Sequence, residues 1–436
     1  MFKPRNLITA LILVLLGFGL GRLFAPDSQR APIPEPPPPL ADSATEADSG
    51  ADPAETARRA WVDEEAAADT RAELEAVLAH QDAFDRLVAL AELLRGLDES
   101  GLPAVTAVLK DDAVRPDGAG IELLVRFWSR YDPKEATRWS AHAPLAYQAM
   151  AIAPAVEAWA AEDPQAAADA AMSGTTYQGT ANQVAQVALI RGWYESGKPG
   201  LMEFIGELGG ETFEGQRALS TLSRAIVELR GPEAAIEWVQ SIPDEPMKFK
   251  LAAYRQLSSE VAMADLPAAI AFCNEVCDGP YGDGVRQRIA QYWASQDGAA
   301  ALAWLSEAPP GQRRDVAIRV AFDSWNKADQ EAAFAWLTER GFDNVEPWMR
   351  PAVAIYVRLR SFTDPPDALR WTALVPSEVE RQILTVRIAR RWRQRDEAAA
   401  EAWVMNSDLP EELREAARTT DVHAHIPVKR EVKPAI

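Results

Sequence analysis

Histidine and cysteine are scarce in this chain, and their scarcity limits the chemistry that it can perform. The 436 residues include four histidines and two cysteines, and they contain no Cys-x-x-Cys pair and no paired Cys/His zinc spacing. His423 and His425 form a His-x-His pair, which can bind a metal weakly. A structural zinc site, however, takes four ligands, so two near a chain end make a poor site. The sequence predicts no bound metal and no cofactor.

Recognisable catalytic motifs are missing as well. The Gly-x-Ser-x-Gly elbow, Gly-rich phosphate loops and the His-Glu-x-x-His pattern do not occur. Asp and Glu are plentiful, but they fall at expected helix caps and on expected exposed faces. Four scattered histidines cannot supply the nucleophile, base and orienting group that a site needs. The sequence therefore predicts no catalytic residues and a protein that is not an enzyme.

Positive charge is under-represented. Lys and Arg number 45 against 65 Asp and Glu, so the formal net charge is 45 − 65 = −20. Such a chain repels phosphates, which disfavours a nucleic-acid partner. Alternating runs of Val, Ile or Thr are also scarce, whereas Ala is abundant, and this composition favours helices over strands. We expect an all-α fold with a substantial core, because 48% of the residues are hydrophobic.

The N-terminus carries the longest hydrophobic run. Lys3 and Arg5 precede the apolar stretch Leu7–Phe24, and a positive start before such a stretch is typical of an export signal. One interpretation is an uncleaved anchor over residues 1–25, with the N-terminus in the cytoplasm and Arg22 reaching the interface. This would place the rest of the chain in the periplasm of a Gram-negative bacterium, tethered to the inner membrane. The alternatives are a cleaved signal with a soluble periplasmic product, and a buried core helix.

Two segments separate this run from the rest of the chain. Residues 26–60 are rich in Pro, Ala and Asp and poor in large apolar side chains, which predicts a disordered linker stiffened by its prolines. Residues 61–95 show apolar residues at helical spacing and are expected to form leading helices.

Most of the remaining chain repeats one frame. A tryptophan is followed by Asp four residues later, Ala at eight and Trp at eleven, as in Trp293, Asp297, Ala301 and Trp304. The second aromatic place is held by Trp139, Ala170, Phe204, Trp238, Phe272, Trp304, Trp336, Trp371 and Trp403. These places are 31–35 residues apart, a period typical of stacked helical hairpins.

Each place in the frame has a physical role. The Asp place holds only Asp or Gly, both good helix N-caps: Asp132, Asp163, Gly197, Gly231, Asp265, Asp297, Asp329, Asp364 and Asp396. We therefore expect the second helix of every hairpin to begin there. The Ala place is small in eight of nine copies, which predicts close helix–helix approach. The two tryptophans of a copy fall on different helices and should meet across the turn as part of the core.

The period and the small-then-aromatic face resemble tetratricopeptide-like helical-repeat solenoids over residues 96–415. The usual Trp-Leu-Gly-Tyr order on the first helix is missing, so HEAT-like and Sel1-like variants stay open. The resemblance implies a right-handed α-α superhelix (solenoid) of about ten helical hairpins with a concave partner-binding surface, and it implies no catalytic residues. Residues 416–436 are expected to be a flexible C-terminal tail.

Two further features invite a functional interpretation. Cys273 and Cys277 lie one turn apart on one helix, and they are either a disulfide or two packed thiols. A run of arginines makes one helix strongly basic, with Arg387, Arg390, Arg391 and Arg395 as its main members. This run is either a solvated face paired with neighbouring carboxylates or a docking patch for an anionic partner or lipid head groups.

The function that these features favour is non-catalytic. We expect a membrane-tethered periplasmic scaffold or adaptor that binds a protein or peptide on its concave face, in the manner of exported repeat proteins of envelope assembly or secretion. One alternative is a peptidoglycan-associated lytic or binding factor with an unrecognised site. Another is a structural module that associates with itself. The sequence leaves the partner and the oligomeric state open.

Overall fold

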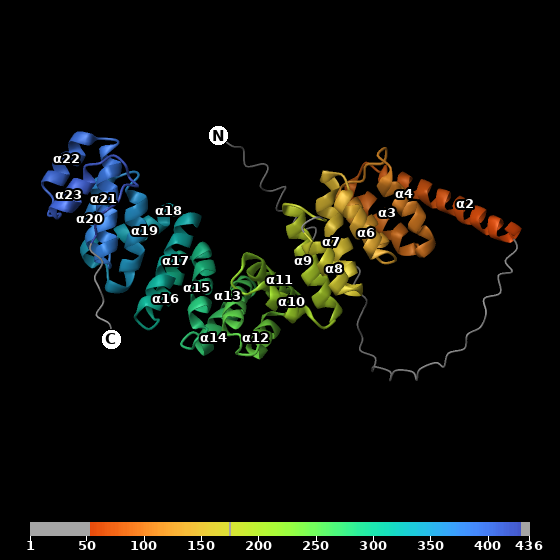
Figure 1. Ribbon diagram of the computed structural model, residues 1–436, viewed down its shortest axis with the longest axis horizontal. Helices are drawn as coiled ribbons and strands as arrows, with labels where there is room; N and C mark the ends of the chain where they lie inside the picture. Colours follow the sequence, from red (N-terminus) through yellow and green to blue (C-terminus); the bar gives the residue numbers. More distant parts are fainter. Residues whose placement is uncertain (1–52, 174–175, 429–436) are drawn as a thin grey trace. The chain divides into compact units, whose positions relative to one another are not determined.

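A computed structural model describes residues 53–173 and 176–428 (Figure 1). This part of the chain is all α-helical, as predicted, with 22 α-helices that pack in sequential order. The pattern is consistent with a helical repeat. The predicted membrane helix, Leu7–Phe24, lies outside the described residues. None of the helices within them is both long enough and apolar enough to cross a membrane.

The chain divides into two compact units, one ending at Lys198 and the other beginning at Pro199. In the first unit the helices are α2 (Pro53–Leu78), α3 (Ala83–Gly96), α4 (Leu102–Lys110), α5 (Gly118–Trp128), α6 (Pro133–His142), α7 (Leu145–Glu162), α8 (Pro164–Met172) and α9 (Thr180–Ser196). The core lies between α2, α3, α4, α5 and α7 and includes Leu74, Leu90 and Trp128. Because α2 begins at Pro53, residues 53–60 of the predicted linker are helical.

The second unit contains the remaining helices. They are α10 (Leu201–Leu208), α11 (Phe213–Arg230), α12 (Pro232–Ser241), α13 (Met247–Ala264), α14 (Leu266–Val276), α15 (Gly282–Gln296), α16 (Gly298–Ser306), α17 (Gln312–Ala328), α18 (Gln330–Thr338), α19 (Arg350–Arg360), α20 (Pro365–Trp371), α21 (Glu378–Arg393), α22 (Glu397–Met405) and α23 (Glu411–Ala417). Along this unit α11, α13, α15, α17 and α19 each pack against the next first helix of a hairpin. In each unit, we call the surface of the first helices that points away from the second helices the first-helix face.

A single aspartate joins the two helices of several hairpins. The Asp297 N–H donates to the carbonyl of Trp293 at 2.7 Å, which closes the last turn of α15. Its carboxylate accepts the Ala300 N–H at 2.9 Å, which caps the first turn of α16. The same arrangement, in which one aspartate ends a helix and caps the next, occurs at Asp163, Asp265 and Asp329. These hydrogen bonds confirm the predicted N-caps. Each aspartate also pairs a backbone carbonyl at the end of the preceding helix, so one residue satisfies groups at both helix ends.

The small and aromatic places of the frame pack as the sequence predicts. The Ala residues of all eight copies are at most 1% exposed: Ala136, Ala167, Ala235, Ala269, Ala301, Ala333, Ala368 and Ala400. The paired tryptophan rings meet across the turn, with centroids 5.7 Å apart for Trp128 and Trp139 and 6.0 Å apart for Trp325 and Trp336. The frame therefore builds the core of the hairpins.

The frame fails at Gly197. This glycine was expected to start a helix, but it has φ 69° and ends α9, while Gly200 precedes α10. A left-handed glycine is the usual end of a helix, and only the absence of a Cβ makes this conformation easy. The two compact units divide directly after it, at Lys198. The predicted repeat domain over residues 96–415 extends across both units.

The C-terminal segment also differs from expectation. Residues 416–436 were predicted to be a flexible tail, but α23 extends to Ala417, and Ile426 and Val428 pack against the core of the last helices. That core includes Val386 and Leu413. The segment up to Val428 thus covers apolar surface of α21, α22 and α23.

Candidate functional site

The two cysteines are joined in a disulfide on the last turn of α14. Their Cα atoms are 4.8 Å apart, and the Cys277 N–H donates to the Cys273 carbonyl at 2.7 Å. Both residues are buried. Gly282 lies against this turn, since an added Cβ there would be 2.1 Å from the Cys277 carbonyl oxygen. The start of α15 therefore packs closely against the disulfide-bonded end of α14.

The arginines predicted to form an anionic-partner patch have separate roles. Arg390 is 1% exposed and points inward from α21. Its Nε donates to the Ala416 carbonyl at 2.7 Å, its Nη1 to Ala424 at 2.6 Å and its Nη2 to His425 at 3.2 Å. Burial lowers the pKa of Arg390. The side chain therefore fastens the C-terminal segment to α21.

The other members of the run lie apart from Arg390. Arg391 donates to the Ser361 hydroxyl at 2.5 Å and lies 3.9 Å from the centroid of the Phe362 ring. Arg395 donates to the Phe362 carbonyl at 2.6 Å. Arg387 is exposed. Three of the four predicted patch residues are thus engaged within the chain, while Arg387 and Arg395 are exposed.

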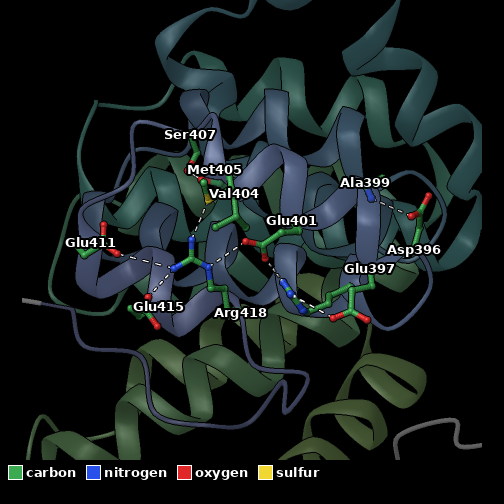
Figure 2. Close-up of polar contacts among 11 residues, drawn as sticks. Asp396, Glu397, Ala399, Glu401, Val404, Met405, Ser407, Glu411, Glu415 and Arg418 are labelled. Carbon is green, nitrogen blue, oxygen red and sulfur yellow. Dashed lines mark hydrogen bonds and ion pairs between the residues drawn. The ribbon is translucent and has the colours of Figure 1, made fainter.

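At the last hairpin, one carboxylate lies between two arginine side chains (Figure 2). Glu401 on α22 accepts from Arg418 at 3.1 Å and from Arg393 at 2.6 Å. Arg418 also donates to Glu415 at 2.6 Å and points toward Met405 in Figure 2. These hydrogen bonds lower the pKa of Glu401 and raise the pKa of Arg418. The network joins α21, α22 and the residue that follows α23.

No metal centre forms in the part of the chain that the structure describes, because no three His, Cys, Asp or Glu side chains come together there. His423 is exposed, and the backbone of His425 is held by Arg390. In this pair, the backbone of His425 therefore helps to hold the C-terminal segment against α21.

A mixed-charge groove in the first unit is the strongest candidate for a binding site. A cavity of about 310 Å³ opens on the first-helix face of α5, α7 and α9. Apolar side chains form much of its wall, and charged groups reach into it: Leu94, Leu123, Phe127, Pro154, Ala158, Ala161, Arg126, Arg130, Glu157 and Glu195. Gly192 forms its floor, where a Cβ would be 2.2 Å from the Glu157 carbonyl oxygen. The glycine thus lets α7 and α9 approach closely.

Glu157 is the least satisfied charge in this groove. Its carboxylate is 24% exposed and lies 3.7 Å from Arg126, which is beyond hydrogen-bonding distance. Arg126 gives its short contacts to Glu122, at 3.0 and 3.1 Å. Burial raises the pKa of Glu157, while the charges of Arg126 and Arg191 act against that rise. A cation brought into the groove would therefore find a carboxylate without a close partner.

The sequence contains a signal for this groove that its analysis missed. Arg126, Glu157 and Arg191 stand two residues before the first aromatic place in three consecutive copies, so their charges alternate in sign at one frame position. Side chains at this position point away from the second helices and therefore lie on the first-helix face. A comparison of copies position by position finds it, whereas a search for motifs does not.

No protein-family model, no curated protein and no solved structure is similar to this chain. Its function is therefore inferred from its own residues.

Proposed function

We propose that this protein is a non-catalytic scaffold that binds a protein or peptide on its first-helix face. Its fold would be a tetratricopeptide-like superhelix. The predicted N-terminal helix would anchor it in the inner membrane with the helical units in the periplasm, in an envelope assembly or secretion complex. The groove around Glu157 supports the binding role, because it combines apolar walls with a carboxylate that lacks a close partner.

The groove favours a partner segment that presents a basic side chain. The methylene groups of Lys or Arg would pack against Leu123 and Pro154, and the charged end would reach Glu157. A charged hydrogen bond made inside such a groove contributes about 1.5–3 kcal/mol. The chain's net charge of −20 adds long-range attraction to a basic partner.

Site-specific photo-crosslinking in intact cells tests this proposal. A photoreactive residue at Ala158 or Ala161 lies in the groove, and one at Asp169, exposed on α8, serves as the matched control. We expect the same partner at both groove positions and not at the control. The purified partner should then bind the full-length protein, and Glu157→Lys should weaken this binding at least tenfold.

Other outcomes separate the remaining functions. Release of muropeptides by the purified protein would establish the peptidoglycan-acting enzyme instead. Crosslinks only to a second copy of the chain, with a dimer in sedimentation, would establish the self-associating module. Equal crosslinking at Asp169 and in the groove would remove the groove from the proposal.

A further inference from the structure

Two arginines on neighbouring first helices of the second unit lie close together. Arg255 on α13 extends its aliphatic part over Gly284 of α15, since an added Cβ at 284 would be 3.1 Å from the Arg255 Cβ and 3.2 Å from its Cγ. Arg288 follows one turn later on α15. Burial lowers the pKa of Arg288, and the positive charge of Arg255 lowers it further. The Arg255 side chain thus passes over the turn of α15 that precedes Arg288.

Two carboxylates of the described residues, one on α13 and one on α17, are engaged elsewhere. Glu260 on α13 accepts from Ser220 at 2.9 Å and from Arg224 at 3.0 Å, both on α11. On the other side, Asp323 of α17 pairs with Lys327 at 2.7 Å and with Arg358 at 3.3 Å. Each of these carboxylates already has a basic partner, so neither is available to balance the arginine pair.

Within the described residues, neither arginine has an ion pair, and one of them has an unsatisfied donor. The Arg255 Nε is buried without an acceptor. The Arg288 Nη1 donates to the Gln291 side chain at 3.2 Å, which supplies no negative charge. Arg314 and Arg414 also bury an unpaired Nε, but their terminal nitrogens reach the Ala308 carbonyl and Glu411.

Such a pair is unusual in a chain with an excess of acidic residues. A buried donor without an acceptor is costly, and like charges held together add to that cost. An oxyanion offsets the repulsion and accepts from the guanidinium N–H groups, whose fork matches carboxylate and phosphate oxygens. We propose that Arg255 and Arg288 form a binding site for one oxyanion, a carboxylate or a phosphate. The anion is either free in solution or carried by an acidic group of the bound partner.

Thermal unfolding of the full-length protein tests the site. The melting temperature is compared in chloride and in inorganic phosphate, acetate or an acetylated triglutamate peptide, at constant pH and ionic strength. We expect at least one of these anions to raise the melting temperature by about 2–4 °C, because a ligand that binds only the folded state stabilises it. A response to phosphate or acetate indicates a free anion, and a response to the peptide alone indicates an acidic group of a partner.

Matched variants assign any response to the arginine pair. Arg255→Gln and Arg288→Gln should each abolish the rise, whereas Arg358→Gln, whose wild-type side chain has a carboxylate partner, should retain it. Arg255→Met keeps the aliphatic part and should melt at the same or a higher temperature than the wild type in chloride. An absent rise with every anion, an equal rise in Arg255→Gln and Arg288→Gln, or a lower melting temperature for Arg255→Met in chloride would overturn the proposal.

Discussion

Gly298 and Trp325 fit together so closely that a side chain at position 298 would displace the indole ring. A Cβ added to Gly298 would lie 1.8 Å from Cδ2 of the Trp325 ring and 2.1 Å from its Cγ. Gly298 is the first residue of α16, and Trp325 lies on α17, the first helix of the next hairpin. The indole thus covers the start of a helix whose N-cap, Asp297, belongs to the preceding copy.

Substitution of this glycine should therefore destabilise the second unit. We expect Gly298→Ala to lower its free energy of unfolding by about 1–3 kcal/mol in urea denaturation, because the ring must move out of a packed position. The matched control is Gly206→Ala in α10, where an added Cβ has no atom within 4 Å. That change should raise stability by about 0.5–1 kcal/mol through helix propensity alone. A gain of stability in both variants would contradict the observed packing.

The tryptophans of the frame should differ in their contributions according to burial. Trp371 is 1% exposed and lies against Tyr356 and Phe342, with centroid distances of 5.1 and 5.6 Å. Trp304 is half-buried and contacts Trp293 at 5.8 Å. We expect Trp371→Ala to cost about 3–5 kcal/mol of unfolding free energy and Trp304→Ala to cost less. Equal costs in urea denaturation would show that the second tryptophan place contributes independently of burial.

The sequence predicts the local interactions of the fold well. The Asp297 carboxylate caps α16 through a backbone group three residues away, so composition and spacing suffice to identify it. Gly197 shows the limit of this reasoning. Glycine is common both at N-caps and in left-handed helix ends, and the frame alone does not distinguish the two. The boundary between the two units lies one residue beyond this glycine.

Long-range interactions decide the candidate sites and could not be read from spacing. Arg390 has the sequence context of a basic surface, yet the carbonyl groups that it binds are 26–35 residues further along the chain. Glu157 looks like any exposed helix glutamate. Its raised pKa arises from burial, and neighbouring helices bring Arg126 and Arg191 near it. Only the recurrence of a charged residue at this frame position, as Arg126, Glu157 and Arg191, indicated that these side chains share a face.

The half-buried Glu157 carboxylate in the groove should make stability depend on pH. Because the pKa of Glu157 is raised in the folded state, that state binds a proton more tightly than the unfolded chain does. The stability of the first unit should therefore fall as pH rises from the ordinary glutamate pKa of about 4.3 through the raised value. Glu157→Gln removes this dependence and should be more stable than the wild type at pH 7.

Urea denaturation at pH 7 and near pH 4 measures the effect. The advantage of Glu157→Gln over the wild type should shrink at the lower pH, where the wild-type carboxyl is protonated in both states. Glu122→Gln is the control, because its carboxylate accepts two short hydrogen bonds from Arg126 and should lose stability at pH 7 when neutralised. A Glu157→Gln variant that is less stable at pH 7 would mean that its pairing with Arg126 outweighs burial.

Removal of the Arg390 side chain should release the C-terminal segment. Its guanidinium donates to three backbone carbonyls, and each hydrogen bond from a charged group contributes about 1.5–3 kcal/mol. We expect Arg390→Met to accelerate amide hydrogen exchange over residues 419–428 at least tenfold and to leave α13 to α17 protected. Arg387→Met, one turn earlier on the exposed side of α21, should change nothing. Unaltered exchange over 419–428 in Arg390→Met would mean that the packing of Ile426 and Val428 holds the segment without the arginine.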